Sequence, residues 1–421
     1  MLTGRTPYGL RYALKRRTGS SVAYVALTIR CGTRDEAGFP GGTAHFTEHT
    51  IFKGTALKSA SRINSCLEKV GGDLNAYTNK EEIVIHATVL KEDVSKAARL
   101  LFELARMPSF PETEIETEKG VVIEEIHSYK DSHADDIFDR FEEMLFKGHP
   151  LGGLILGSAA TVRKISPSML KDFVKTRFTP DRMAISVVAD IDEKKLEASL
   201  LKDAMPFFPD SPSSPAPDSP MTAPEPSLTT EYRMPEPLHF NKTIDKRSHE
   251  ADVIIGGLAP SLYETKERTA LNLLGNILGG PGSNSLLNTS LREKHGWVYG
   301  IETWYNRYAE TGSFGISFGC DKSNIDKCFR EIDKICTKVR EKPFSPTFLK
   351  AAKKQLFGQM AISSDFGETS CLSMGKNMIS FNRIAPNSEI LEAFEAITPD
   401  DLCAIAAKIL DPGRLSTLVY L

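Results

Sequence analysis

A proline-rich stretch near the middle of the chain limits what this sequence can fold into. Residues 206–226 read PFFPDSPSSPAPDSPMTAPEP and hold eight of the 24 prolines found among 421 residues. Proline at this density cannot continue a helix or a central strand, because it lacks a backbone N–H and its ring fixes φ. We therefore predict an extended linker at 206–227 between two domains of similar size, 1–205 and 228–421.

Hydrophobic patterns typical of strands and helices occur on both sides of this linker. Short β-branched runs predict strands, and apolar residues along one face predict helices. The predicted strands are Val22–Ile29, Ile83–Leu90, Met183–Ala189, Val253–Ile255, Phe314–Phe318 and Leu415–Leu421, and the predicted helices are Lys91–Met107 and Ile325–Val339. Leu67–Gly71 resembles Leu291–Gly296, and strands and then a helix follow each segment, which indicates an internal duplication. The sequence thus predicts an α+β fold of two homologous α/β-sandwich halves with mostly antiparallel sheets.

Composition excludes several classes of protein. Lys and Arg number 52 against 55 Asp and Glu, so the chain lacks the basic surface of a nucleic-acid-binding protein. No apolar run approaches the roughly 20 residues of a membrane-spanning helix. The first residues, MLTGRTPYGLRYALKRRTGS, contain no apolar core of a secretory signal. We therefore expect a cytoplasmic protein that has neither nucleic acid nor membrane as a partner.

Two histidines in the segment GGTAHFTEH have the spacing of a metal site. His45 and His49 are four residues apart, which places them about 40° apart on one helix face. Two such imidazoles can share a Zn²⁺ ion. Glu48 lies about 60° to one side of His45, where it can reach an attacking water without being a ligand. The order H-x-x-E-H is the inverse of the H-E-x-x-H motif, and the alternative is a chance match or a structural histidine pair.

The residues around this motif resemble a known family. The block Cys31–Thr55, CGTRDEAGFPGGTAHFTEHTIFKGT, is similar to the signature of the inverzincin metallopeptidases, which include pitrilysin, insulysin and the mitochondrial processing peptidase. The resemblance implies one Zn²⁺ per chain, bound by His45, His49 and Glu125, with Glu48 as the catalytic acid and base.

The resemblance also selects among the acidic residues of a later segment. It implies that Glu118 supports a zinc ligand. Glu118 and Glu125 are two helical turns apart and share a face, whereas Glu124 points elsewhere. The alternative for each of these acids is a solvated helix surface.

Two further segments match the family more weakly. GGDLNAYT, residues 71–78, resembles the edge strand on which the family binds its peptide substrate, which implies contacts from Asn75 and Ala76. LREKHGWVYG contains Arg292 and Tyr299 at the positions of the family's Arg/Tyr pair, which stabilises the tetrahedral intermediate. The alternatives are an ordinary hairpin for the first segment, and a helix-end arginine with a half-buried tyrosine for the second.

The resemblance therefore implies a zinc metalloendopeptidase or oligopeptidase that hydrolyses unfolded peptides. Longer family members carry two such half-molecules in one chain, and the two halves close as a clamshell. This chain resembles one of those halves. We expect a dimer around an enclosed chamber, with a homodimer preferred and a heterodimer possible. The alternatives are the catalytic subunit of a heterodimeric processing peptidase and a non-catalytic structural subunit of the same fold.

Overall fold

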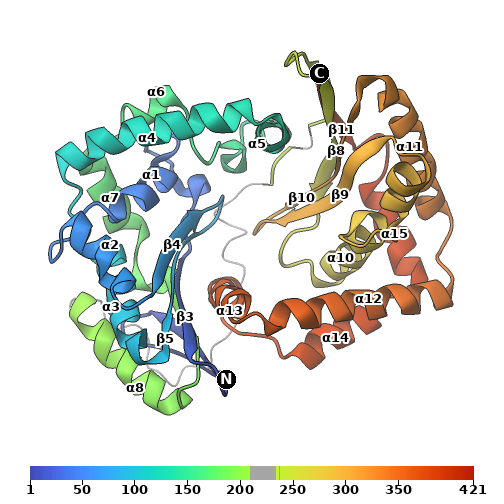
Figure 1. Cartoon of the computed structure of the whole chain (residues 1–421). Coiled ribbons are helices and arrows are strands. Elements are labelled where there is room, and N and C mark those ends of the chain that lie inside the picture. The colour runs from blue at the N-terminus through green and yellow to red at the C-terminus, as the bar shows by residue number, and fades with distance from the viewer. Residues whose placement is uncertain (209–233, 237) are drawn as a thin grey trace. The chain divides into compact units, whose positions relative to one another are not determined.

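The computed structural model describes residues 1–208, 234–236 and 238–421. The linker predicted at 206–227 lies, from residue 209 onward, outside the described residues. The chain forms two compact units (Figure 1). Unit 1 contains residues 1–127, the described part of 153–225, and 362–384, and unit 2 contains the remainder. Each unit thus includes a segment from the other side of the predicted linker.

Unit 1 is built on a mixed, mostly antiparallel sheet. Its strands are β1 (Leu2–Arg5), β2 (Arg11–Arg16), β3 (Val22–Ile29), β4 (Asp73–Thr78), β5 (Ile83–Leu90) and β6 (Met183–Ala189). They lie in the order β1-β2-β6-β3-β5-β4, and β2 and β6 form the one parallel pair within this sheet. The three strands predicted in this half are confirmed with the bounds expected for them.

Helices cover both faces of this sheet, as the sequence of β3 requires. Val25 and Leu27 pack in one core beneath α3 (Val94–Arg106), whereas Tyr24 and Ala26 face a second cluster beneath α13 (Gly367–Phe381). Both faces of the sheet are therefore covered at β3, which explains why the sequence of this strand, VAYVALTI, is almost continuously apolar. The helices of unit 1 are α1 (Thr43–Ile51), α2 (Ala60–Glu68), α3 (Val94–Arg106), α4 (Glu112–Asp131), α6 (Ala159–Val162), α7 (Pro167–Arg177), α8 (Glu193–Ala204) and α13 (Gly367–Phe381).

Unit 2 repeats this plan. Its strands are β7 (Asn241–Ile244), β8 (Glu250–Ala259), β9 (Val298–Arg307), β10 (Gly312–Asp321) and β11 (Ser416–Tyr420), and its helices are α5 (His133–Leu145), α10 (Thr265–Gly279), α11 (Ile325–Glu341), α12 (Pro346–Asp365), α14 (Asn387–Glu395) and α15 (Pro399–Ile409). The strand order is β7-β11-β8-β10-β9, with the first pair parallel and the others antiparallel. This matches β2-β6-β3-β5-β4 strand for strand, so the expected α+β fold with two related halves is confirmed.

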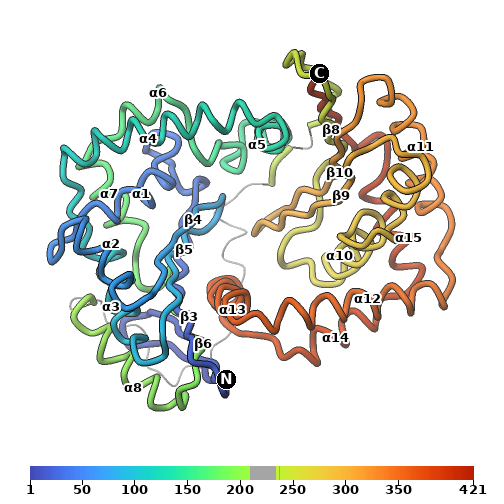
Figure 2. The backbone as a smooth tube through the Cα atoms, viewed as in Figure 1, coloured from blue at the N-terminus to red at the C-terminus, as the bar shows by residue number. Residues whose placement is uncertain are grey.

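Two helices pack in the unit that does not contain their neighbours in sequence. Helix α13 follows the linker but packs on β2, β3 and β6 of unit 1, and its orange-red trace can be followed in Figure 2. Helix α5 precedes the linker but packs on β8 and β11 of unit 2. Gly375 permits the close approach of α13, because a Cβ there would lie 2.3 Å from Thr28 Oγ1.

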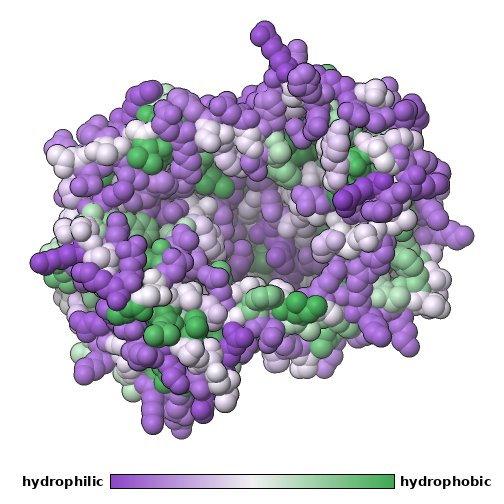
Figure 3. Space-filling model, viewed as in Figure 1, coloured by the Kyte–Doolittle hydropathy of each residue, from purple (hydrophilic) through white to green (hydrophobic). Residues whose placement is uncertain are grey.

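The face of the molecule seen in Figure 3 is mainly polar. Figure 3 shows hydrophilic side chains over most of the visible face, with hydrophobic side chains in scattered patches. None of the helices in the described part of the chain combines the length and the apolar composition that a membrane crossing requires.

Candidate metal centre

The helix that carries the H-x-x-E-H motif begins at a glycine that no other residue can easily replace. Gly42 precedes α1 with φ of 88°, in the left-handed region. A Cβ at Gly42 would lie 2.7 Å from Leu156 O, so the backbone of residues 156–157 can approach only because the side chain is absent. Within α1, Thr47 and Thr50 are buried and donate their hydroxyls to carbonyl oxygens of the preceding turn.

A buried glutamate caps the first turn of α1. Glu36 accepts hydrogen bonds from Gly42 N at 2.9 Å and from Ala44 N at 2.7 Å. These donors belong to the group of N–H bonds that a helix N-terminus leaves unpaired. Burial raises the pKa of Glu36 to about 8, and the two backbone donors act in the opposite direction. The capping bonds thus offset part of the cost of burying this carboxylate and fix the start of the helix.

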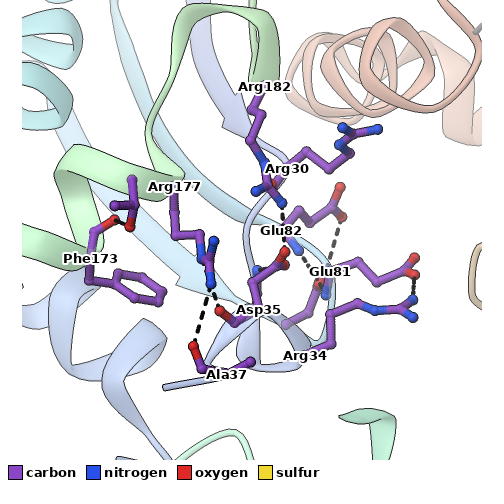
Figure 4. A network of polar contacts seen from close by, with 12 residues as sticks. Arg30, Arg34, Asp35, Ala37, Glu81, Glu82, Phe173, Arg177 and Arg182 are labelled. Atoms are coloured by element: carbon purple, nitrogen blue, oxygen red, sulfur yellow. Dashed lines mark hydrogen bonds and ion pairs between the residues drawn. The ribbon is translucent and has the colours of Figure 1, made fainter. Parts of the chain in front are cut away.

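The turn before Glu36 is held by a network of arginines and acids (Figure 4). Arg182 pairs with Asp35 Oδ1 at 2.6 Å, and Arg177 Nε donates to Asp35 O at 3.0 Å. Arg34 pairs with Glu81 in the turn between β4 and β5. The segment that leads into α1 is therefore tied to α7, to the turn that precedes β6, and to the β4–β5 turn.

Three of the predicted site residues converge. His45 Nε2 lies 3.6 Å from Glu125 Oε1, and His49 Nε2 lies 3.4 Å from Glu125 Oε2. One donor atom from each residue lies within 4.8 Å of the others, and within the described residues this is the one such group of His, Cys, Asp and Glu. His45 and His49 come from α1, and Glu125 comes from α4.

This donor set fits a tetrahedral Zn²⁺. Ligand atoms about 2.0–2.2 Å from zinc lie roughly 3.4 Å apart in a tetrahedron, close to the observed nitrogen–oxygen distances. Glu125 Oε2 is buried, and its contact with His49 Nε2 at 3.4 Å is longer than an ordinary hydrogen bond, so this oxygen can accept a cation. Two imidazoles and one carboxylate are zinc ligands, and they leave one position for water or substrate.

The charges at this site attract one positive ion. Burial and the neighbouring His49 lower the pKa of His45 to about 4, which keeps its imidazole neutral. Burial also lowers the pKa of His49, but hydrogen bonds to Glu118 and Glu125 outweigh it and raise that pKa to about 9. The bond to His49 lowers the pKa of Glu125. Two carboxylates thus surround His49, and a proton or a metal ion can balance them.

Glu48 lies on the same helix and hydrogen-bonds the end of β4. Thr78 Oγ1 donates to Glu48 Oε2 at 2.8 Å. Burial raises the pKa of Glu48, although the bond from Thr78 and the charge of His49 lower it. A partly buried carboxyl with a raised pKa is suited to accept a proton and return it.

The acidic residues of α4 differ in their surroundings. Glu118 is buried, and its Oε1 lies 3.0 Å from His49 Nδ1, whereas Glu124 is exposed and lies 3.7 Å from His127. Burial raises the pKa of Glu118, but its bonds to His49 and Lys53 outweigh this and lower the pKa.

The remaining predicted residues lie elsewhere in the fold. Asn75 and Ala76 are in β4, which is the edge strand of the sheet of unit 1. Arg292 and Tyr299 belong to unit 2. Arg292 lies in the π-helical segment Asn288–Lys294, and Tyr299 lies in the edge strand β9, where its hydroxyl bonds Asp321 at 3.2 Å. A π-helix is rare and is often found at functional sites.

Sequence reasoning missed three residues of this centre. Glu36, Lys53 and Thr78 hold α1, Glu118 and Glu48, respectively. Glu36 precedes the helix by the length of a loop, so no short-range capping pattern reveals it. Lys53 and Thr78 contact partners that are distant in sequence, so no local pattern reveals these contacts.

Comparison of the sequence with known protein families identifies the class to which the chain belongs. The profile of insulinase (peptidase family M16) matches residues 11–159, and the profile of the peptidase M16 inactive domain matches residues 164–356. The chain belongs to the M16 peptidase family.

Its curated relatives are similar over nearly their whole length. An uncharacterized zinc protease of Streptomyces coelicolor is 27% identical over 98% of this chain and 87% of its own. An uncharacterized zinc protease of Bacillus subtilis is 27% identical over 95% and 93%. The mitochondrial-processing peptidase subunit beta of Saccharomyces cerevisiae is 27% identical over 95% and 86%.

Solved structures show the same fold. The peptidase M16 inactive domain from Pseudomonas fluorescens superposes with a TM-score of 0.87 at 18% identity, covering 100% of this chain and 97% of the other. A protease from Helicobacter pylori gives a TM-score of 0.86 at 18% identity, covering 100% and 98%.

Proposed function

We propose that this protein is a zinc-dependent endopeptidase or oligopeptidase and that the centre on α1 and α4 is its active site. The observation that carries this proposal is the convergence of His45, His49 and Glu125, whose donor atoms lie within 4.8 Å of one another. The names of the relatives, which are zinc proteases and a processing-peptidase subunit, support both the metal and the reaction.

The residues of the centre divide the chemical work. His45 Nε2, His49 Nε2 and a Glu125 oxygen would hold Zn²⁺, which supplies a Lewis acid for the scissile carbonyl and for water. Glu48 accepts the proton of the attacking water and passes it to the leaving amine. Its burial favours the protonated form that this second step needs. Thr78 fixes the carboxylate of Glu48 throughout.

The substrate is an extended peptide. Among the described residues β4 pairs with β5 on one side only, so its other edge offers N–H and C=O groups that have no strand partner to an added strand. Asn75 and Ala76 lie on this strand and would contact the peptide backbone. A segment must leave its own fold to pair in this way, which favours unfolded polypeptides over folded proteins.

The proposal assigns Arg292 and Tyr299 to the developing oxyanion. Removal of one such donor commonly costs about 3–4 kcal/mol of transition-state stabilisation. Both residues and the zinc ligands occur in one chain, so a homodimer with an enclosed chamber can combine them. The yeast relative is named as a subunit, which favours a heterodimer as the alternative. A non-catalytic subunit is disfavoured because Glu48 and all three candidate ligands are present.

Cleavage of an unstructured fluorogenic peptide by the Glu48→Gln variant tests the reaction. Loss of the general base should lower kcat by about 10²–10⁴-fold while zinc content stays at the parent level. Cleavage at the parent rate would contradict the proposal.

Mixing subunits tests the shared site. Glu48→Gln and Arg292→Ala chains, each inactive alone, should recover part of the activity when combined, if one active site draws residues from two chains. A mixture that stays inactive would exclude this dimeric arrangement.

A further inference from the structure

A lysine just beyond α1 completes a chain of contacts that ends at His49. Glu118 Oε1 lies 3.0 Å from His49 Nδ1, and Glu118 Oε2 lies 2.7 Å from Lys53 Nζ. Lys53 lies in the turn that follows the last residue of α1, and the backbone N–H of Lys53 donates to Thr50 O at 3.1 Å. Both partners of Glu118 therefore come from one short segment of chain, and Glu118 comes from α4.

The ion pair between Lys53 and Glu118 differs from an ordinary surface ion pair, because Glu118 is buried. The Glu118 side chain is 6% exposed and that of Lys53 is 30% exposed. A buried carboxylate is costly unless its charge is balanced and its oxygens are hydrogen-bonded. A metal-binding imidazole is neutral, so His49 would donate one hydrogen bond to Glu118 but no full positive charge. The charge of Lys53 then balances that of Glu118.

The orientation of His49 depends on this carboxylate. Donation of Nδ1–H to Glu118 leaves the lone pair on Nε2, the nitrogen that lies 3.4 Å from Glu125. If Glu118 moved or turned away, the His49 ring would lose the partner that fixes its tautomer. Partners of this kind typically change metal affinity about 10–100-fold when they are removed.

We propose that Lys53 is a positioning residue of the metal centre, which holds Glu118 against His49 and thereby raises the affinity of the site for Zn²⁺. The inference rests on the proposed zinc site. It predicts that the positive charge at residue 53 matters for metal binding even though Lys53 does not contact the metal.

The chain contains a matched control five residues away. Lys58 is also 30% exposed and pairs with a buried glutamate, Glu103, which is 2% exposed. Glu103 accepts a further bond from Thr55 Oγ1, and neither it nor Lys58 contacts the candidate ligands. Replacing Lys58 thus breaks the same type of ion pair in the same stretch of chain, away from the metal centre.

The test measures Zn²⁺ affinity of the metal-free full-length chain by competition with a chromophoric chelator. Lys53→Met should weaken zinc binding about tenfold or more, and Lys53→Arg, which keeps the charge, should bind within a few-fold of the parent. Lys58→Met should bind zinc like the parent. Equal affinity in Lys53→Met and the parent, or equal weakening in both methionine variants, would overturn the inference.

A double variant distinguishes this pathway from general destabilisation. If Lys53 acts through Glu118, then Lys53→Met should weaken zinc binding little further in a Glu118→Gln background. If the double variant instead loses zinc affinity by the product of the two single-variant losses, the pathway through Glu118 is overturned. If Lys53→Met does not fold, Lys53→Gln replaces it in the same comparison. A parent chain whose zinc binding does not depend on Glu125 would refute the proposed function itself, whereas the outcomes above refute only the role of Lys53.

Discussion

Thr78, the last residue of β4, donates a hydrogen bond to Glu48 on α1 over 2.8 Å. The contact joins the candidate general base to the strand whose free edge is the candidate peptide-binding surface. Thr78→Val removes only the hydroxyl, so we expect kcat to fall about tenfold, as for loss of one hydrogen bond to a charged group, with zinc content unchanged. Thr78→Ser should restore most of the activity. Equal kcat in the valine variant and the parent would show that Glu48 does not need this bond.

The cap at Glu36 should be visible in stability. Glu36→Ala leaves the N–H groups of Gly42 and Ala44 without their partner, which should cost about 1–3 kcal/mol of unfolding free energy. Chemical denaturation of the metal-free chain measures this. Glu68→Ala, at an exposed glutamate at the end of α2, is the control and should change stability by less than about 0.5 kcal/mol. Similar values for the two variants would contradict the capping role.

Helix α13 should stabilise unit 1 although it follows the linker. Met378 is fully buried against β-strand residues of unit 1, among them Ala26 and Val188. Met378→Ala should therefore cost about 2–5 kcal/mol of unfolding free energy. Met205→Ala, at an exposed methionine, should cost little. Hydrogen exchange can locate the effect, because faster exchange in β3 and β6 is expected in the Met378 variant. Unchanged exchange in these strands would contradict the packing.

Much of the fold could be predicted from local patterns. Val22–Ile29 and Met183–Ala189 are strands with the predicted bounds, because alternate residues of both are buried on opposite faces and each run is apolar except for one residue, Thr28 or Ser186. The duplication inferred from Leu67–Gly71 and Leu291–Gly296 corresponds to a repeated strand order, since each segment ends just before β4 or β9.

The positions of α5 and α13 could not be predicted from the sequence. An amphipathic pattern shows that a helix has a buried face but not which sheet lies beneath it. Met374 and Met378 mark such a face on α13, and only the fold shows that it covers β3. The π-helical segment that contains Arg292 could not be predicted either, because its seven residues are fewer than the roughly 11 residues over which a helical period can be read from sequence.

The candidate site was predictable where spacing and resemblance carried the information. His45, Glu48 and His49 share one helical turn, and the resemblance supplied Glu125 from another helix. Glu36, Lys53 and Thr78 were beyond prediction because each acts on the site through a contact between separate elements.

Zinc content after a single substitution in α4 tests the central claim most directly. Glu125 and Glu124 are adjacent in sequence, but only Glu125 reaches the two histidines. We predict about one zinc per chain and peptide cleavage in the parent and in Glu124→Gln, and a large loss of both in Glu125→Gln. A Glu125→Gln variant that keeps its zinc and its activity would contradict the proposed metal centre.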